Sequence, residues 1–326
     1  MKKIRNQKYR YYYNNLSPTE KKYYDLMYYG FIKQKDRILM LNANKYEIQK
    51  IFNFIMMDNP DIYYVKKIAC EMNGIGCVKD VRVEYNYSID KIAKMTGLID
   101  RECAYFIHQH LYDTDYEKAI AIHDYIVEEC VYGNKYEEHT HSIIGVFGYQ
   151  EAVCEGIAKA YKFLSDKLNL SCIVVYGNAV ADGVREPHAW NMIEVEGNMI
   201  HIDVTYDLMN SDNELIRYDY FGLSENDLIT REIDYCIPGS YTGFSYYLFN
   251  GMYAHSKSHL VNIVKSYTKI NKWITFQMPA CKDRDIYEKI LKIIQNSLVP
   301  IYEKSYKLEM KYNADKGVYS YIIYNV

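Results

Sequence analysis

The chain has 326 residues, of which 49% are hydrophobic and 25% charged, and its formal net charge is −3. This composition is typical of a globular protein with more than one folded unit and a sizeable core. A net charge this small argues against a nucleic-acid partner, because no strong basic field is available to hold phosphates.

The first residues of the chain and its cysteines indicate where in the cell the protein is expected. The basic start MKKIRNQKYRYYYNN is not followed by an apolar stretch, and no run approaches the roughly 20 apolar residues of a membrane span. The eight cysteines are scattered and form no C-x-x-C pair, which argues against a zinc knuckle. We therefore expect a cytoplasmic chain with reduced thiols and no membrane partner.

The first hundred residues predict helices and a small sheet. Ser17, Pro18 and Glu20 form a capping pattern that predicts a helix over 17–33. DRILML predicts a strand, and KYEIQKIFNFIMMDNP predicts a helix that stops before its proline. Two alternating segments joined by NGIG then predict a hairpin.

The remaining elements follow in a similar pattern. A helix is expected in TDYEKAIAIHDYIVEECVYG, with His123 on its apolar side in a structural role. The middle segment predicts a helix that carries Cys154 and then three strands. The order strand–helix–strand–strand occurs near 36–87 and again near 272–325, so we expect two similar flanking units and consider a shared sheet.

These elements predict three units. Residues 1–100 form an N-terminal helical and β-α-β-β unit, residues 101–238 form the core, and residues 239–326 form a C-terminal β-α-β-β unit.

Cys154 lies where a turn-like segment meets an amphipathic helix. Apolar side chains recur at helical spacing around it, at Val153, Ile157, Tyr161 and Leu164. The helix is expected to begin at about 151–154, so Cys154 falls in its first turn. Free amide N–H groups and the positive end of the helix dipole stabilise a thiolate there, and a thiolate attacks acyl carbons. The alternative is a core thiol, which is the usual role of a lone cysteine in an apolar helix.

The segment EPHAWNMIEVEGNMIHIDVTYD supplies candidate partners for Cys154. If residues 196–197 form a two-residue turn, His188 lies opposite Thr205, and Asp203 is its diagonal neighbour on the same face. A three-residue loop would place the two side chains on opposite faces. The pattern thus permits an Asp203–His188 hydrogen bond and the order nucleophile, base and orienting acid. Taken singly, a histidine such as His188 is more often buried with its hydrogen bonds satisfied. An aspartate at a strand end, such as Asp203, more often accepts a hydrogen bond from a turn amide.

Three motifs carry a family resemblance. The segments AVCEGIAKAY, EPHAWNMI and HIDVTYD resemble the motifs VC-x-G-x-A-x-A, P-H-A-W-N and H-x-D-x-T-x-D of the transglutaminase-like superfamily, in its bacterial branch. The resemblance covers about residues 115–208. Ile157 departs from it, because an aromatic residue is more usual there, but this position faces packing rather than chemistry. The resemblance implies an α+β fold with a papain-like core, in which a helix bearing the cysteine packs on an antiparallel sheet. Small N- and C-terminal α/β units would flank this core.

The resemblance also implies catalytic roles. Cys154 would be the nucleophile, His188 the general base and then the acid, and Asp203 the residue that holds the imidazole. The backbone N–H of Cys154 would be one oxyanion donor.

Three further residues are candidates for oxyanion or substrate contacts. Gln150 and Tyr149 are the nearby candidates for the second oxyanion donor. Trp190 would shield the site from water, with core packing as the alternative.

No cofactor and no metal is expected. The pairs HQH at 108–110 and HTH at 139–141 have no third ligand nearby in sequence, and two residues at i and i+2 of a helix point apart. The nucleotide-binding motifs GxxxxGK[ST] and GxGxxG are both absent from the sequence. The calcium sites of animal transglutaminases are not evident.

Two classes of function follow. The first is a thiol-dependent acyl-transfer enzyme acting on a peptide or protein substrate, as a cysteine peptidase or amidase if water resolves the acyl-enzyme. A crosslinking protein-glutamine transamidase is the alternative if an amine does. The second class is a non-catalytic peptide-binding scaffold, against which the complete set of Cys154, His188 and Asp203 argues.

Overall fold

The computed structural model describes residues 10–181, 183–267, 273–281, 285–298 and 306–325. The chain forms two compact units. The first holds the chain up to residue 216 together with residues 225–242, and the second holds residues 217–224 and the chain from residue 243 onward. The division into three units stays a prediction.

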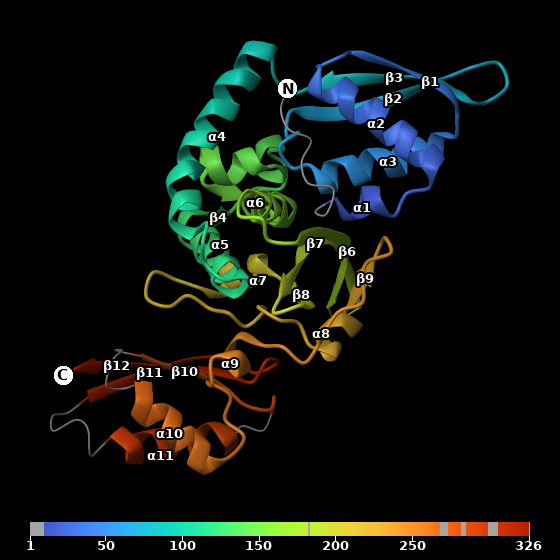
Figure 1. Cartoon of the computed structure of the whole chain (residues 1–326). Helices are drawn as coiled ribbons and strands as arrows, with labels where there is room; N and C mark the ends of the chain where they lie inside the picture. Colours follow the sequence, from blue (N-terminus) through green and yellow to red (C-terminus); the bar gives the residue numbers. More distant parts are fainter. Residues whose placement is uncertain (1–9, 182, 268–272, 282–284, 299–305, 326) are drawn as a thin grey trace. The chain divides into compact units, whose positions relative to one another are not determined.

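The N-terminal part of the first unit is a three-stranded antiparallel sheet with two helices on it (Figure 1). Its elements are α1 (Tyr11–Asn14), α2 (Pro18–Ile32), β1 (Arg37–Ala43), α3 (Lys45–Asp58), β2 (Val65–Met72) and β3 (Val78–Tyr85). The strand order is β1-β3-β2. The predicted capping box is confirmed, because Ser17 accepts from the Glu20 amide while the Glu20 carboxylate accepts from the Ser17 amide.

The rest of the first unit is a helix-covered antiparallel sheet of order β8-β7-β6-β9. The helices are α4 (Ile89–His110), α5 (Asp115–Glu129), α6 (Cys154–Lys167), α7 (Val204–Asn210) and α8 (Glu225–Ile229). The four strands are β6 (Cys172–Ala181), β7 (Val184–Val195), β8 (Asn198–Ile202) and β9 (Arg231–Ile233). Between α5 and α6 lie β4 (Val131–Tyr132), the 3-10 helix η2 (Glu138–His141), the π-helix η3 (Gly145–Tyr149) and β5 (Glu151–Ala152).

Helix α6 is the centre of this region. All of its residues from 156 to 165 are buried, so it is covered on every side. Tyr161 donates to the carbonyl of Ala119 on α5 at 2.7 Å, and Asn191 on β7 donates to the carbonyl of Ala158 at 3.0 Å. These bonds tie the middle of α6 to α5 and to β7 of the sheet. The predicted α+β core, with a cysteine-bearing helix on an antiparallel sheet, is confirmed.

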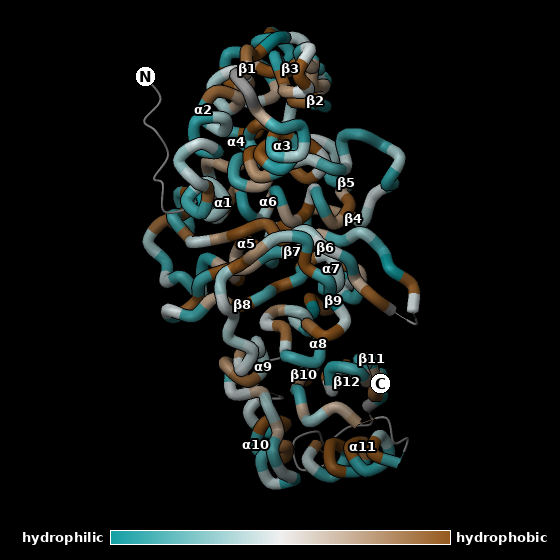
Figure 2. Tube along the Cα trace, turned by 90° about the vertical axis from the view of Figure 1, so that its right-hand side faces the viewer, coloured by the Kyte–Doolittle hydropathy of each residue, from teal (hydrophilic) through white to brown (hydrophobic). Residues whose placement is uncertain are grey.

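The second unit contains α9 (Tyr246–Phe249), α10 (Lys257–Tyr267), β10 (Trp273–Gln277), α11 (Asp285–Leu298), β11 (Tyr306–Asn313) and β12 (Val318–Asn325). Its sheet has the order β10-β12-β11. Hydrophobic and hydrophilic stretches alternate around α11 (Figure 2), whose apolar stripe packs into a core with the sheet, through Ile290, Ile294 and Leu298.

The two small sheets repeat one topology. Each follows the order helix, strand, helix, strand, strand, and in each the last strand lies in the middle. They are nevertheless separate three-stranded sheets, so the shared sheet considered from the sequence is wrong. Helices α4, α7 and α10 were not predicted. Among the described residues, no helix combines the length and apolar character that a membrane crossing requires.

Candidate active site

Cys154 is the first residue of α6, as predicted. Val153 is the N-cap, and its side chain cannot accept a hydrogen bond, so no capping side chain occupies the first-turn amides. The Val153 amide donates to the carbonyl of Thr140 at 3.0 Å, which holds this turn against η2. Gly156 permits the approach, since a Cβ there would lie 2.2 Å from the Thr140 oxygen. The turn therefore needs a glycine two residues after the cysteine.

The hairpin that carries His188 has the predicted register. Val195 pairs with Asn198, and the two-residue turn between them has φ values of 49° at Glu196 and 77° at Gly197. His188 Nε2 lies 2.7 Å from Asp203 Oδ2.

The chain after β8 differs from the prediction. The strand ends at Ile202, and Asp203 is the N-cap of α7, where Oδ1 accepts from the Tyr206 amide at 3.4 Å. Thr205 therefore lies in a helix and not opposite His188 in the sheet, which corrects that expectation. Asp203 uses one oxygen to begin a helix and the other to hold the imidazole.

Arg231, which was not predicted, completes the surroundings of Asp203. Its Nη2 lies 2.7 Å from the same Oδ2 that contacts His188. The guanidinium carbon lies 4.8 Å from the Trp190 ring centre and 5.3 Å from the Tyr206 ring centre. Arg231 comes from β9, which pairs with β6, so this contact depends on a strand far along the chain.

The imidazole of His188 stacks with two aromatic rings. The Tyr206 ring is stacked at 5.1 Å and the Trp190 ring at 5.9 Å. Trp190 is 1% exposed, and its Nε1 donates to His201 Nδ1 at 2.9 Å. Burial and then the charge of Arg231 lower the pKa of His201 to about 4, so this ring is neutral and can accept.

The charge state of the pair follows from its surroundings. Burial lowers the pKa of His188, but the charge and hydrogen bond of Asp203 and a hydrogen bond with Cys154 outweigh it and raise the pKa to about 9. Burial raises the pKa of Asp203, but His188 and Arg231 lower it overall to about 2. At neutral pH the pair is therefore an imidazolium and a carboxylate. Because Nε2 faces Asp203, Nδ1 is the nitrogen left for the thiol.

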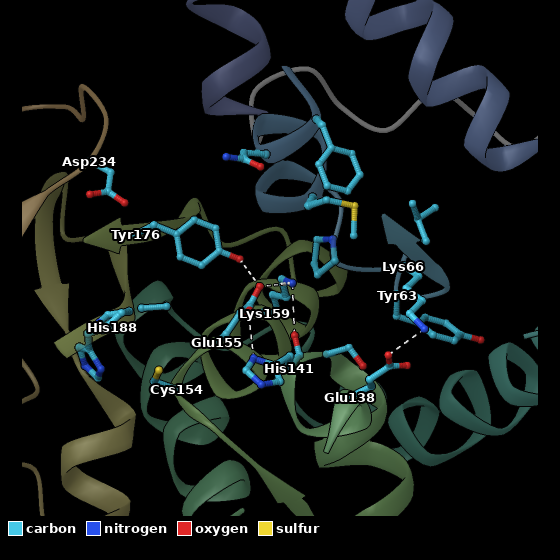
Figure 3. Close-up of a pocket in the computed structure, with 18 of the residues that line it drawn as sticks. Tyr63, Lys66, Glu138, His141, Cys154, Glu155, Lys159, Tyr176, His188 and Asp234 are labelled. Carbon is cyan, nitrogen blue, oxygen red and sulfur yellow. Dashed lines mark hydrogen bonds and ion pairs between the residues drawn. The ribbon is translucent and has the colours of Figure 1, made fainter. Parts of the chain in front are cut away.

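Cys154 and His188 line one pocket of about 560 Å³ (Figure 3). The N-terminal part of the same unit supplies another wall through α3, β2 and the loop between them, with Phe52, Met56, Tyr63 and Val65. The structure thus places Cys154 and His188 at one pocket and Asp203 in contact with His188, while the catalytic roles expected for these three residues stay predictions.

The candidates for the second oxyanion donor lie elsewhere. Tyr149 stacks on His139 at 4.1 Å between ring centres, and Gln150 donates to Glu129 at 3.2 Å. Neither residue is among those that line the pocket, and Trp190 lies behind His188 rather than in the pocket wall. Their roles in the chemistry stay predictions.

Comparison with known proteins identifies the central region. Residues 107–204 match the family model of the Transglutaminase-like superfamily. We call these matched residues the transglutaminase-like region. Among curated proteins, none matches the chain significantly.

Solved structures give more distant likenesses. One, described as a "Putative Cysteine Protease from Cytophaga hutchinsonii", has a TM-score of 0.29 and 16% identity over 43% of this chain and 61% of the other. Another, described as a TGase, has a TM-score of 0.32 and 14% identity over 55% of this chain and 52% of the other. The chain therefore spans less than two thirds of the length of either structure.

The transglutaminase-like region contains a second polar cluster next to Cys154. Glu155 accepts from Lys159 at 2.6 Å, from Tyr176 at 2.7 Å and from His141 at 3.0 Å (Figure 3). Burial alone would raise the pKa of Glu155, but the charge of Lys159 and the hydrogen bonds lower it overall. The i, i+4 spacing of Glu155 and Lys159 is the one sequence signal for this cluster.

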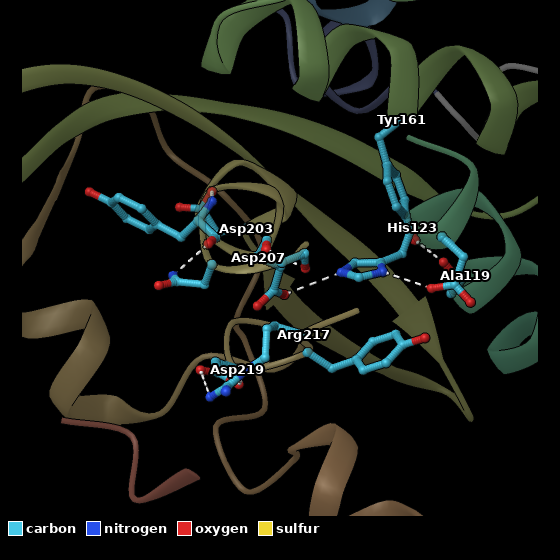
Figure 4. Close-up of polar contacts among 12 residues, drawn as sticks. Ala119, His123, Tyr161, Asp203, Asp207, Arg217 and Asp219 are labelled. Atoms are coloured by element: carbon cyan, nitrogen blue, oxygen red, sulfur yellow. Dashed lines mark hydrogen bonds and ion pairs between the residues drawn. The ribbon is translucent and has the colours of Figure 1, made fainter. Parts of the chain in front are cut away.

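A buried histidine joins two helices of the transglutaminase-like region. His123 on α5 contacts Asp124 at 3.0 Å and Asp207 on α7 at 3.3 Å (Figure 4). Burial lowers the pKa of His123, but the two carboxylates raise it overall to about 9. The structural role expected for His123 is therefore that of an imidazolium that ties α5 to the helix after Asp203.

The two histidines of the HTH segment each contact a glutamate. His139 contacts Glu151 at 2.7 Å, and His141 contacts Glu155. Within the described ranges, no group of three or more His, Cys, Asp or Glu side chains is arranged to hold a metal ion. All eight cysteines are free thiols.

Proposed function

We propose that this protein is a thiol-dependent acyl-transfer enzyme that cleaves peptide or amide bonds through an acyl-enzyme on Cys154. The observation that carries the proposal is the placement of Cys154 at the N-terminus of α6, on the same pocket as an imidazole held by a buried carboxylate. The superfamily of residues 107–204 supports it.

The proposed reaction uses three side chains. The Cys154 thiolate attacks the carbonyl carbon of the amide, and the first-turn amides of α6 face the charge that develops on oxygen. The His188 imidazolium gives its proton to the leaving nitrogen as the carbon–nitrogen bond breaks. The now neutral His188 then takes a proton from water as the water oxygen attacks the thioester. The carbon–sulfur bond breaks, and the acid and the Cys154 thiolate are released beside the restored His188 imidazolium. Asp203 keeps the imidazole oriented throughout.

Water and amines compete at the second step. An amine that attacks the same thioester gives a new amide, so transamidation shares every residue named above. We propose hydrolysis because water is the acceptor that is always present.

The proposal is tested with a mixture of unblocked peptides, analysed by intact-protein mass spectrometry after acid quenching. The expected result is an acyl adduct on the wild type, absent from Cys154→Ala and retained in Cys236→Ala, which removes an exposed thiol. Peptide products with free carboxyl ends indicate hydrolysis, and their replacement by amides on adding a primary amine indicates transamidation. Equal cleavage by wild type and Cys154→Ala contradicts the proposal.

A further inference from the structure

The pocket extends well beyond the reactive pair. Cys154 and His188 lie on one side of it, the Glu155 cluster lies in the middle, and Lys66 and Glu138 lie on the other side (Figure 3). A substrate held for attack at Cys154 therefore has room for a side chain next to the scissile bond.

One wall of this space is carbon-rich. Phe52 and Met56 are four residues apart on α3 and so lie on the same face of the helix, and both are half-buried. Pro60, Tyr63 and Val65 continue the wall, and the last two are each 5% exposed. Filling the space with an apolar side chain would remove the half-buried carbon surface of this wall from water.

The charged groups in the middle of the pocket already have partners. Glu155 is bound by Lys159, His141 and Tyr176. A charged substrate group placed beside Glu155 would lose part of its water and compete with these contacts. The other charged side chains of the lining are exposed, so solvent screens them: Lys66 and Glu138 form an ion pair at 3.0 Å, and Asp234 is an exposed carboxylate.

We propose that the residue next to the scissile bond carries an uncharged aliphatic or aromatic side chain, which packs on the wall of Phe52, Met56 and Tyr63. The inference rests on the proposed thiol chemistry, because it assumes attack from Cys154. The N-terminal β-α-β-β part then selects the substrate that the transglutaminase-like region cleaves.

Peptidyl chloromethyl ketones test this selection, because Cys154 displaces chloride and the second-order inactivation rate reports the fit of the adjacent side chain. Four probes carry Phe, Leu, Glu or Lys beside the reactive carbon, and iodoacetamide serves as the probe without a side chain. The Phe and Leu probes are expected to react at least roughly tenfold faster than the Glu and Lys probes.

Two variants of α3 locate the effect. Met56→Asp is expected to remove most of the preference, measured as the ratio of each probe's rate to the iodoacetamide rate of the same protein. Tyr46→Asp, on the same helix but 85% exposed and outside the pocket, should keep both the preference and the iodoacetamide rate. Met56→Gln, neutral and similar in length, should weaken the preference by a smaller factor if the aspartate variant does not fold.

The failures are distinguishable. Equal rates for the four probes, or faster reaction with Glu or Lys, with normal iodoacetamide alkylation, overturn this inference alone. Slow iodoacetamide alkylation of Cys154 overturns the proposed function and this inference with it.

Discussion

Arg231 Nη2 and Asp203 Oδ2 lie 2.7 Å apart, and both groups are buried. The same oxygen contacts His188, so Arg231 fixes the carboxylate that orients the imidazole. Arg231 is thus a positioning residue, because its described contacts are to Asp203 and to the rings that flank His188.

Removal of the Arg231 guanidinium should loosen this arrangement. Arg231→Met is expected to slow peptide cleavage by roughly tenfold to a hundredfold, because small misplacements of a catalytic base have large effects on rate. Arg231→Lys keeps the positive charge but lacks the planar guanidinium, so its cleavage rate should lie between those of wild type and Arg231→Met. Alkylation of Cys154 at pH 10, where an ordinary thiol ionises without help, should be equal in all three proteins. Unchanged cleavage by Arg231→Met would contradict the positioning role.

Gly177 on β6 allows β9, and therefore Arg231, to approach β6 closely. A Cβ at Gly177 would lie 1.8 Å from the Glu232 backbone oxygen, so Gly177→Ala must displace β9. We expect this variant to melt at a lower temperature and to cleave peptides more slowly. Gly97→Ala, in helix α4 with no atom within 4 Å of the new Cβ, should be neutral or stabilising by up to about 1 kcal/mol. Equal melting temperatures for the two variants would show that β9 is not held in this way.

The pH dependence of cleavage should have an upper limit set by His188. Its pKa is raised to about 9, so the imidazolium that protonates the leaving nitrogen is present below that pH and is lost above it. kcat/KM should therefore fall as the pH rises through about 9. Asp203→Asn removes the carboxylate charge that raises this pKa, and should move the limb to lower pH. A limb that stays at the same pH in that variant would assign it to another group.

His123 should stabilise the fold in a pH-dependent manner. Its pKa is raised to about 9 from an ordinary value near 6.5, so its stabilisation is complete below about pH 6.5 and is lost as the pH rises through about 9. His123→Gln leaves Asp207 without its ionic partner on α5 and should lower the free energy of unfolding by roughly 3–5 kcal/mol at pH 6. Urea unfolding at pH 6 and pH 10 measures both values, and the difference between the proteins should shrink at the higher pH. A constant difference would mean that His123 is not charged in the fold.

Local sequence patterns were enough to predict much of the site. The start of α6 at Cys154 followed from apolar spacing, and the hairpin register followed from the turn at Glu196 and Gly197, which both adopt positive φ. That register brings the end of β8 near His188, and Asp203, the next residue, reaches the imidazole as the N-cap of α7.

Contacts between distant segments could not be read from local patterns. Arg231 reaches Asp203 because β9 pairs with β6, after the chain has visited the second unit and returned. Helix α7 begins directly after β8 because Asp203 caps it, whereas HIDVTYD alternates in the way a strand does. One wall of the pocket comes from α3, β2 and the loop between them, and the apolar residues there do not indicate in the sequence which segment they will face.

The most direct test of the account is the rate of Cys154 alkylation by iodoacetamide as a function of pH, in wild type and in His188→Ala. A thiolate paired with the His188 imidazolium predicts fast alkylation at pH 6, well below the range in which ordinary thiols ionise, and the variant should lose it. Slow alkylation at pH 6 that is unchanged in His188→Ala would contradict the account, and would make Cys154 an unreactive thiol in a peptide-binding scaffold.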